Sequence, residues 1–238
     1  YIYMKKLFIT ILASFLLSSA AFAASFNIGA TGALMTVEAS GQEVTGAGAS
    51  GAANTNKTNV DNENVGVASF FAEYSSDFYG LTLGVEVTPG TADVSNKIKT
   101  RNDVEASKTG GQATTTTNRT FKANAEIENL QQIYVELPIY KSLFVRGGLA
   151  QLDVNTTEVA SGNGGSYGNK TLDGSSFGIG LKGNYSANEN IGFKLFYEET
   201  NFDTLNLTST GNSVAAETNS IKADLDTQAI KFAVSYNF

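Results

Sequence analysis

Eight charged residues of this chain are spaced like side chains on one face of β-strands. Most stand between two apolar residues, as Glu136 does between Val135 and Leu137, so a strand would point the charge to one side and its neighbours to the other. The set contains four acids and four bases: Glu73, Glu86, Glu136, Arg146, Lys182, Lys194, Glu198 and Lys231. Side chains of these types transfer protons, hold ions or pair with one another, depending on the elements that position them.

Other reactive residue types are missing. The 238 residues include no His and no Cys, so the commonest general base and metal ligand is excluded, as are thiolate chemistry and disulfides. A Ser/Lys or carboxylate-only site would need its members in one place, and the sequence contains no such constellation. Asp203, Asp224 and Asp226 are better interpreted as solvated surface acids than as ligands of a divalent ion. We therefore expect no enzyme activity, no metal and no cofactor.

The segments that carry the eight charges alternate apolar and polar residues with a period of two. The clearest is Ile230 to Phe238, which ends the chain and has an apolar residue at every second position. Seven earlier segments show the same alternation, and their apolar sets begin at Phe26, Ala68, Leu81, Ile133, Leu143, Phe177 and Ile191. In the segment from Leu143, Leu152 and Val154 change parity, which leaves the register beyond Gln151 open.

The fold class that this pattern predicts is all-β, an up-and-down antiparallel transmembrane β-barrel. After Ala24 no stretch is long and apolar enough for a transmembrane helix, so a chain of this kind crosses a membrane only as a closed barrel. Short and long connections alternate, which predicts tight periplasmic turns and four long extracellular loops. The predicted loops span about residues 39–64, 88–129, 155–175 and 201–226.

Each long loop is polar, and it is either disordered or an extension of its strand pair beyond the membrane. Gly110 and Gly111 predict a hairpin within residues 88–129, and its flanks lack an apolar face. We place this hairpin outside the lipid and count eight strands in the barrel, with ten as the alternative.

The first 23 residues have the features of a secretory signal peptide. These features are, in order, the charged residues Lys5 and Lys6, an apolar run from Leu7 to Leu17, and the small residues Ala21 and Ala23. We expect cleavage before Ala24, with Met4 as the natural start. A membrane anchor would need roughly 20 apolar residues, and Ser18 and Ser19 interrupt this run. Residues 24–238 are then one barrel domain.

Aromatic residues gather near the short-turn ends of the predicted strands: Tyr74, Phe78, Tyr79, Tyr140, Phe144, Tyr185, Tyr236 and Phe238. We interpret them as a periplasmic aromatic girdle. The opposite, polar face of the strands fills the barrel. Because an eight-stranded barrel is only wide enough for side chains, the eight charges must neutralise one another or be reached by water.

The chain resembles the small eight-stranded outer-membrane barrels of the OmpA-like and OmpX-like type, grouped as a porin-family or outer-membrane β-barrel domain. The resemblance is architectural and covers nearly all of the mature chain. It implies that the terminal strand closes the barrel and carries the assembly signal, here Phe232, Val234, Tyr236 and Phe238. It also implies an interior salt-bridge network that blocks or gates a pore, joined by Glu73, Glu136, Arg146, Lys182 and Lys194. We expect the peptidoglycan-binding domain of full-length OmpA-type proteins to be absent.

Two functions fit these observations. The first is a non-enzymatic integral barrel of the Gram-negative outer membrane that acts through its extracellular loops, as surface structure, adhesin or phage receptor, with its interior plugged by charges. The alternative is a narrow, porin-like channel for small solutes or ions. The expected partners are outer-membrane lipid and lipopolysaccharide, periplasmic chaperones, the barrel-assembly machinery, and an extracellular ligand or phage. A net charge of -7 argues against nucleic acid.

Overall fold

The computed structural model describes residues 25–45, 54–76, 79–94, 99–109, 112–160, 166–210 and 218–238, and every regular element among them is a β-strand. The strands are β1 (Ser25–Thr45), β2 (Asn54–Ser75), β3 (Thr82–Asp93), β4 (Lys99–Thr109), β5 (Gln112–Tyr140), β6 (Leu143–Ala160), β7 (Lys170–Tyr185), β8 (Asn188–Phe202), β9 (Leu205–Thr208) and β10 (Ser220–Asn237). Within these residues, no helix is long and apolar enough to cross a membrane.

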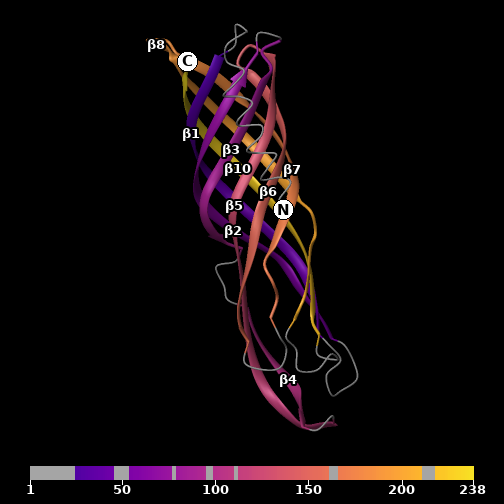
Figure 1. Cartoon of the computed structure of the whole chain (residues 1–238). Helices are drawn as coiled ribbons and strands as arrows, with labels where there is room; N and C mark the ends of the chain where they lie inside the picture. The colour runs from indigo at the N-terminus through magenta and orange to yellow at the C-terminus, as the bar shows by residue number, and fades with distance from the viewer. Residues whose placement is uncertain are drawn as a thin grey trace.

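Eight of these strands close a barrel. Their order around it is β1-β2-β3-β5-β6-β7-β8-β10, and every neighbouring pair is antiparallel. Closure comes from β1 and β10, which pair continuously from Asn27 opposite Asn237 to Val44 opposite Ser220. Figure 1 shows the strands tilted around a common axis, with the C-terminus at one end of the barrel. The predicted eight-stranded, up-and-down barrel is confirmed.

The two remaining strands lie outside this ring. β4 pairs only with the first half of β5, from Thr109 opposite Gln112 to Lys99 opposite Ala123. This is the predicted hairpin; its central Gly110 and Gly111 lie outside the described residues. β9 pairs with the first residues of β10. β1 and β2 also continue far into the range 39–64, so the strand pair extends there.

The two ends of the barrel differ. At one, which we call the turn end, the connections are short and fall at residues 76–81, 141–142 and 186–187. Tyr79 and Lys141 adopt positive φ angles of 51° and 48° there, as tight turns between strands require. At the other, the loop end, the β4–β5 hairpin and the extensions of β1 and β2 project beyond the ring (Figure 1).

A band of large apolar side chains faces outward around the barrel. Exposed members include Ile28, Leu34, Phe70, Leu83, Leu137, Leu149, Phe177, Ile179, Leu181, Leu195, Tyr197, Ile230, Phe232 and Val234. Leu34 is 75% and Phe70 59% exposed, values that water would penalise and lipid would not. Toward the loop end the outward residues become polar, as at Glu38 and Asp226. A closed barrel with such a band is a transmembrane barrel of the outer-membrane type.

The aromatic girdle needs one correction. Tyr79, Tyr140, Tyr185, Tyr236 and Phe238 are exposed at the turn end, whereas Phe144 is fully buried inside the barrel. Phe144 lies between the outward residues Leu143 and Val145, so strand parity turns it inward. Phe78, the signal-peptide range 1–23 and the cleavage residues Ala21, Ala23 and Ala24 lie outside the described residues.

Candidate functional site

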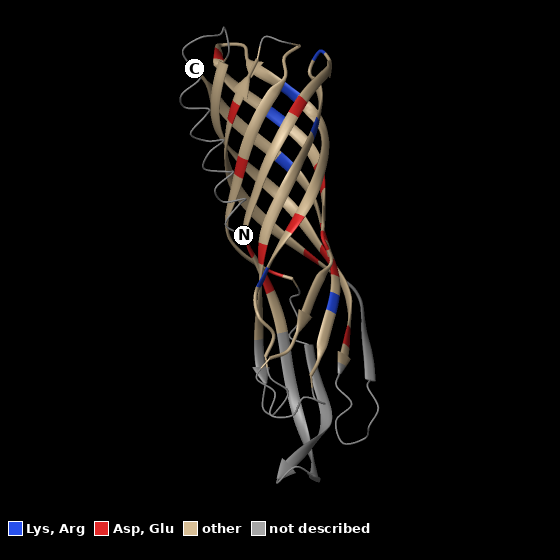
Figure 2. Ribbon diagram, turned by 45° about the vertical axis from the view of Figure 1, so that its right-hand side comes forward, with Lys and Arg blue, Asp and Glu red and all other residues tan. Residues whose placement is uncertain are grey.

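The candidate site is the barrel interior. All eight charges singled out in the sequence point into it, and seven of them are 9% exposed or less; Lys182 is the exception. Figure 2 shows basic and acidic positions interleaved on the strands of the barrel body. The register divides them into two groups of two acids and two bases each, and each group is electrically neutral when all members are charged.

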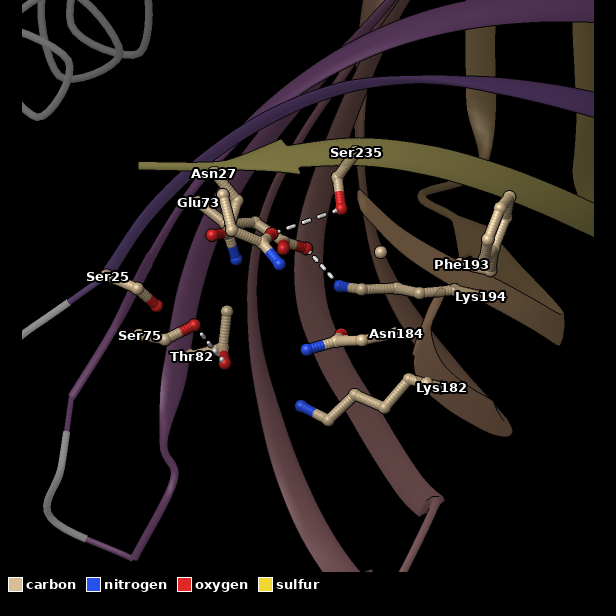
Figure 3. Close-up of a pocket in the computed structure, with 13 residues that line it drawn as sticks. Ser25, Asn27, Glu73, Ser75, Thr82, Lys182, Asn184, Phe193, Lys194 and Ser235 are labelled. Carbon is tan, nitrogen blue, oxygen red and sulfur yellow. Dashed lines mark hydrogen bonds and ion pairs between the residues drawn. The ribbon is translucent and has the colours of Figure 1, made fainter. Parts of the chain in front are cut away.

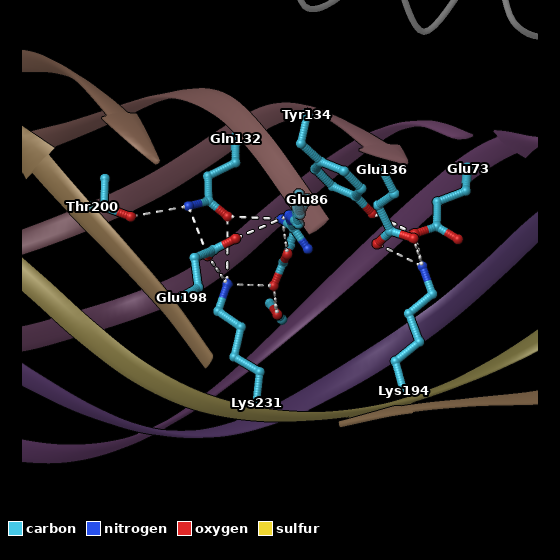
Figure 4. A network of polar contacts seen from close by, with 11 residues as sticks. Glu73, Glu86, Gln132, Tyr134, Glu136, Lys194, Glu198, Thr200 and Lys231 are labelled. Carbon is cyan, nitrogen blue, oxygen red and sulfur yellow. Dashed lines mark hydrogen bonds and ion pairs between the residues drawn. The ribbon is translucent and has the colours of Figure 1, made fainter. Parts of the chain in front are cut away.

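The first quartet, Glu73, Glu136, Lys182 and Lys194, lies nearer the turn end. Lys194 donates to Glu73 Oε1 and to both carboxylate oxygens of Glu136, the latter at 2.8 Å (Figure 4). Lys182 Nζ is 3.7 Å from Glu136 Oε2, a looser contact. Lys182 and Lys194 are direct cross-strand partners, a like-charge arrangement that is unfavourable alone. Because Glu136 contacts both ammonium groups, the pair is compensated.

The second quartet, Glu86, Arg146, Glu198 and Lys231, lies deeper in the barrel. Arg146 Nη2 donates to Glu86 Oε2 at 2.6 Å, and Arg146 Nε is 2.9 Å from Glu198 Oε2. Lys231 Nζ approaches the same two acids, at 2.6 Å from Glu198 Oε1 and 3.2 Å from Glu86 Oε1. Each base therefore bridges both acids, and the four side chains form a closed ring of ion pairs. Figure 4 shows Lys231 between Glu86 and Glu198.

Neutral side chains that carry no charge signal in the sequence complete this network. Tyr134 donates its hydroxyl to Glu73 Oε1 at 2.8 Å, and Ser69 donates to Glu86 Oε1 at 2.5 Å. Gln132 donates to Glu198 Oε1 at 3.0 Å while its own oxygen accepts from Arg146. Gln132 and Tyr134 precede Glu136 by four and two residues, so strand parity alone was the signal that pointed to them.

Aromatic rings fill the space around the ion pairs. The guanidinium of Arg146 lies 3.4 Å from the ring centroid of Tyr134, and Phe144 meets Phe196 edge to face at 5.9 Å. Neighbouring strands make room for these rings with glycine. A Cβ on Gly84 would lie 2.2 Å from Tyr134, and one on Gly180 would lie 2.3 Å from Phe196 Cβ. These glycines are therefore required by packing.

Toward the loop end the interior becomes apolar. A cluster of buried side chains crosses the lumen there: Met35, Val37, Ile127, Ala150, Leu152, Val154, Leu172, Phe202, Leu205, Leu207, Leu225 and Ala229. We call this the apolar layer. The β6–β7 ladder runs without a shift from Leu143 to Val154. The register therefore does not change at Leu152; the inward face itself becomes apolar, which sequence parity alone could not distinguish from a slip.

A polar vestibule opens at the turn end. Its volume is about 240 Å³, and Figure 3 shows Asn27, Ser75, Thr82, Asn184 and Ser235 around it. Glu73, Lys182 and Lys194 also line it, so the first quartet forms its inner boundary. The 28% exposure of the Lys182 side chain is a consequence of this position. Water can reach the first quartet from the turn end, whereas the second quartet lies behind it.

The arrangement pairs the interior charges with one another. In the described part of the chain, no group of three or more His, Cys, Asp or Glu side chains is placed to hold a metal ion. The acids are engaged by Lys, Arg, Ser, Tyr or Gln donors. Such a network links strands across the lumen.

The predicted assembly signal lies on the outer face of β10. Phe232, Val234, Tyr236 and Phe238 are 40–69% exposed and face away from the charge network. Phe238 is held at the barrel seam, because its backbone N–H donates to the Phe26 carbonyl and its ring lies 6.1 Å from the Phe26 ring. Their role in assembly stays a prediction.

No protein-family model matches this sequence, and no curated protein does. Among solved structures, the chain is similar to the outer membrane protein OprG from Pseudomonas aeruginosa, with 12% identity, coverage of 91% of this chain and 97% of that chain, and a TM-score of 0.49. The outer membrane protein AlkL gives 14% identity, 93% coverage of both chains and a TM-score of 0.48. Neisserial surface protein A gives 12% identity, coverage of 91% and 99%, and 0.41. The fold assignment itself rests on the closed register and the apolar band: this chain is an eight-stranded outer-membrane-type β-barrel with a buried salt-bridge network.

Proposed function

We propose that this chain is a non-enzymatic, integral protein of the Gram-negative outer membrane that presents its loop end at the cell surface and does not conduct ions. The observation that supports the proposal is the filled interior. Two neutral quartets, the aromatic rings around them and the apolar layer follow one another along the axis. The lack of His and Cys supports a role without catalysis.

The parts left for interaction lie beyond the apolar band. β1 and β2 pair as far as Thr45 opposite Asn54, and the β4–β5 hairpin extends from β5, which β3 separates from β2 in the ring. In this proposal these extensions act as surface structure, adhesin or phage receptor. The lipid and lipopolysaccharide of the membrane, periplasmic chaperones and the barrel-assembly machinery are the further partners that a protein of this kind would meet.

Single cysteines test the orientation, because the chain has none of its own. Thr208→Cys places a thiol at an exposed site of the loop end, and Ala187→Cys places one at the turn end. On intact cells, a membrane-impermeant maleimide should label Thr208→Cys, and Ala187→Cys only after the cells are opened. The reverse pattern would refute the surface role of the loop end. Heat-dependent mobility on a detergent gel checks that both variants are folded.

Planar-bilayer recording of the refolded chain, residues 24–238, tests the closed interior. We expect no steady single-channel openings from protein shown to be folded and inserted. The vestibule supports the alternative of a narrow channel, because it already admits water to the first quartet. Reproducible openings that change in Lys194→Met or Glu136→Gln would establish that alternative and reject the closed barrel.

A further inference from the structure

A short segment lies at the mouth of the barrel at the loop end. It comprises residues 166–169, directly before β7, and we call it the strap. Its backbone forms an isolated bridge with Thr210: Ser166 N–H donates to the Thr210 carbonyl, and Thr210 N–H donates back, both at 2.9 Å. Thr156 of β6 donates its hydroxyl to the Tyr167 carbonyl at 3.0 Å. The strap therefore lies between β6 and the segment that follows β9.

The Tyr167 side chain connects the strap with a further part of the wall. Its hydroxyl donates to Glu43 Oε1 of β1 at 2.9 Å. In the ring, β8 and β10 separate β1 from β7, the strand that follows the strap, so this hydrogen bond joins two parts of the wall that are not neighbours. The Tyr167 ring is partly buried and packs against the apolar layer. Tyr167 therefore covers part of that layer from the loop end.

Little buried surface holds the strap in this position. Ser166, Gly168 and Asn169 are exposed, so Tyr167 contributes most of the surface that the strap buries. A segment with exposed hydrogen bonds and few buried contacts opens at a much smaller cost in free energy than the barrel unfolds. Leu205 and Leu207, on the strand that leads to Thr210, belong to the apolar layer and are 8% and 9% exposed. They are the side chains that an open strap would bring into contact with water.

We propose that the strap is a lid on the lumen and that the Tyr167–Glu43 hydrogen bond is its catch. With the catch closed, Tyr167 shields the apolar layer from water at the loop end. When the catch opens, the strap leaves Thr210 and the Tyr167 ring leaves the apolar layer in one step. The lid deepens the closed interior of the proposed function, on which it rests: it is a part of that closure which opens without unfolding the barrel.

Amide hydrogen exchange of the refolded chain, residues 24–238, in phospholipid nanodiscs measures this opening. The Ser166 and Thr210 amides exchange when their bridge opens, whereas the Ser209 amide donates to the Asn219 carbonyl at 2.8 Å and serves as the neighbouring control. Tyr167→Phe removes the hydroxyl and keeps the ring. Because one such hydrogen bond changes an equilibrium by a factor of roughly 2–10, both bridge amides should exchange faster by one common factor in that range. The exchange rate of the Ser209 amide should not change.

Further variants separate the catch from a general loosening of the loop end. Glu43→Gln keeps a side-chain oxygen that accepts from Tyr167, so it should accelerate the bridge amides less than Glu43→Leu does. Glu43→Leu should accelerate them at least as much as Tyr167→Phe. Thr204→Val is the matched control, because it removes a hydrogen bond at the same end, from Thr204 Oγ1 to Asp224 Oδ1 at 2.7 Å, without changing the strap. It should leave the bridge amides as they are.

Exposure of the apolar layer is measured separately, with methyl-labelled leucine and a water-soluble gadolinium chelate. The chelate should relax the Leu205 and Leu207 methyl groups more strongly in Tyr167→Phe than in the parent chain. Since the chain has no Cys, Ser166→Cys with Thr210→Cys adds a single disulfide. The Cα atoms of a hydrogen-bonded antiparallel pair are about 5.5 Å apart, a distance that a disulfide spans. This lock should abolish the gain in relaxation, and reduction of the disulfide should restore it.

Three results would overturn the lid. The first is unchanged exchange of the bridge amides in Tyr167→Phe. The second is acceleration of the Ser209 amide by the same factor, because the loop end would then loosen as a whole. The third is faster exchange without stronger relaxation of Leu205 and Leu207, since a strap that opens without exposing the apolar layer is not a lid. Any of these with a silent barrel in planar bilayers rejects the lid alone, whereas steady channel openings together with the expected exchange reject the closed interior alone.

Discussion

Replacing Arg146 by methionine should be the most destabilising single change in the barrel interior. Arg146 contacts Glu86 at 2.6 Å and Glu198 at 2.9 Å, and it is 2% exposed. Without it, both acids must share Lys231, and the second quartet carries one uncompensated negative charge. Removing one partner of a buried ion pair costs roughly 3–5 kcal/mol. We expect the free energy of unfolding of Arg146→Met to fall by an amount in that range.

The assay is urea unfolding of the refolded barrel in lipid vesicles. The chain has no Trp, so far-ultraviolet circular dichroism and the gel mobility of unheated samples report the folded fraction. With a slope of about 2 kcal/mol/M, such a loss lowers the urea midpoint by roughly 1.5–2.5 M. Lys182→Met is the control within the network. The Lys182 side chain is 28% exposed, and its Nζ is 3.7 Å from Glu136 Oε2. The free energy of unfolding of Lys182→Met should therefore fall by less than about 1 kcal/mol.

A second substitution separates charge from packing. Arg146→Met combined with Glu198→Gln makes the quartet neutral again, because Lys231 then faces Glu86 alone. If the cost is that of an unpaired buried charge, the double variant should regain more than half of the lost stability. A double variant no more stable than Arg146→Met would mean that the lost stacking on Tyr134 dominates. A loss below about 1 kcal/mol in Arg146→Met itself would refute the reasoning.

Three further predictions use the same preparation. Gly84→Ala should cost about 1–3 kcal/mol, because its Cβ would overlap Tyr134, whereas Gly183→Ala, with no atom within 4 Å of its Cβ, should change the unfolding free energy by less than about 0.5 kcal/mol. Asp226 lies beyond the apolar band, and burial, then repulsion from Glu38, Asp224 and Glu199, raises its pKa above the ordinary 3.8. A raised acid pKa favours the folded state only when the group is protonated, so its contribution is lost as pH rises through the folded pKa. Asp226→Asn should therefore raise the urea midpoint at pH 7 and not at pH 3; a gain that is equal at both would exclude this cause. Phe238→Ser should reduce the fraction of chain inserted into the outer membrane, measured by fractionation, and normal insertion would remove Phe238 from the assembly signal.

Strand parity made most of the barrel predictable. Once Val135 and Leu137 are placed outward, Glu136 must face inward, and the same step fixes all eight charges. The partners could not be predicted this way. Whether Lys194 meets Glu73 or Glu86 depends on how far each strand is staggered around the ring, and the hydrophobic pattern does not encode that stagger.

The errors have a common origin. Phe144 lies near a turn like the other members of the predicted girdle, but its parity places it beside Arg146 on the inner face. Leu152 and Val154 leave the register open in the sequence only if an apolar residue must face outward. Both interpretations assume that the interior of a membrane barrel is polar. Here Phe144 packs on Phe196, and Leu152 joins the apolar layer, so apolar side chains occur on both faces of β6.

The order of the interior layers bears on how the closed barrel can be tested. The quartets and the apolar layer lie in series along one axis, so opening either one leaves the other in place. A narrow apolar constriction excludes ions by dewetting even where no charge blocks it. Silence of Lys194→Met alone would therefore be compatible with a gate as well as with a plug. The comparison that separates them sets Leu152→Ser alone beside Leu152→Ser combined with Lys194→Met. If the charges only fill space, conductance should depend on Leu152→Ser and be alike in the two variants; if they gate, conductance should also change with the charge at residue 194.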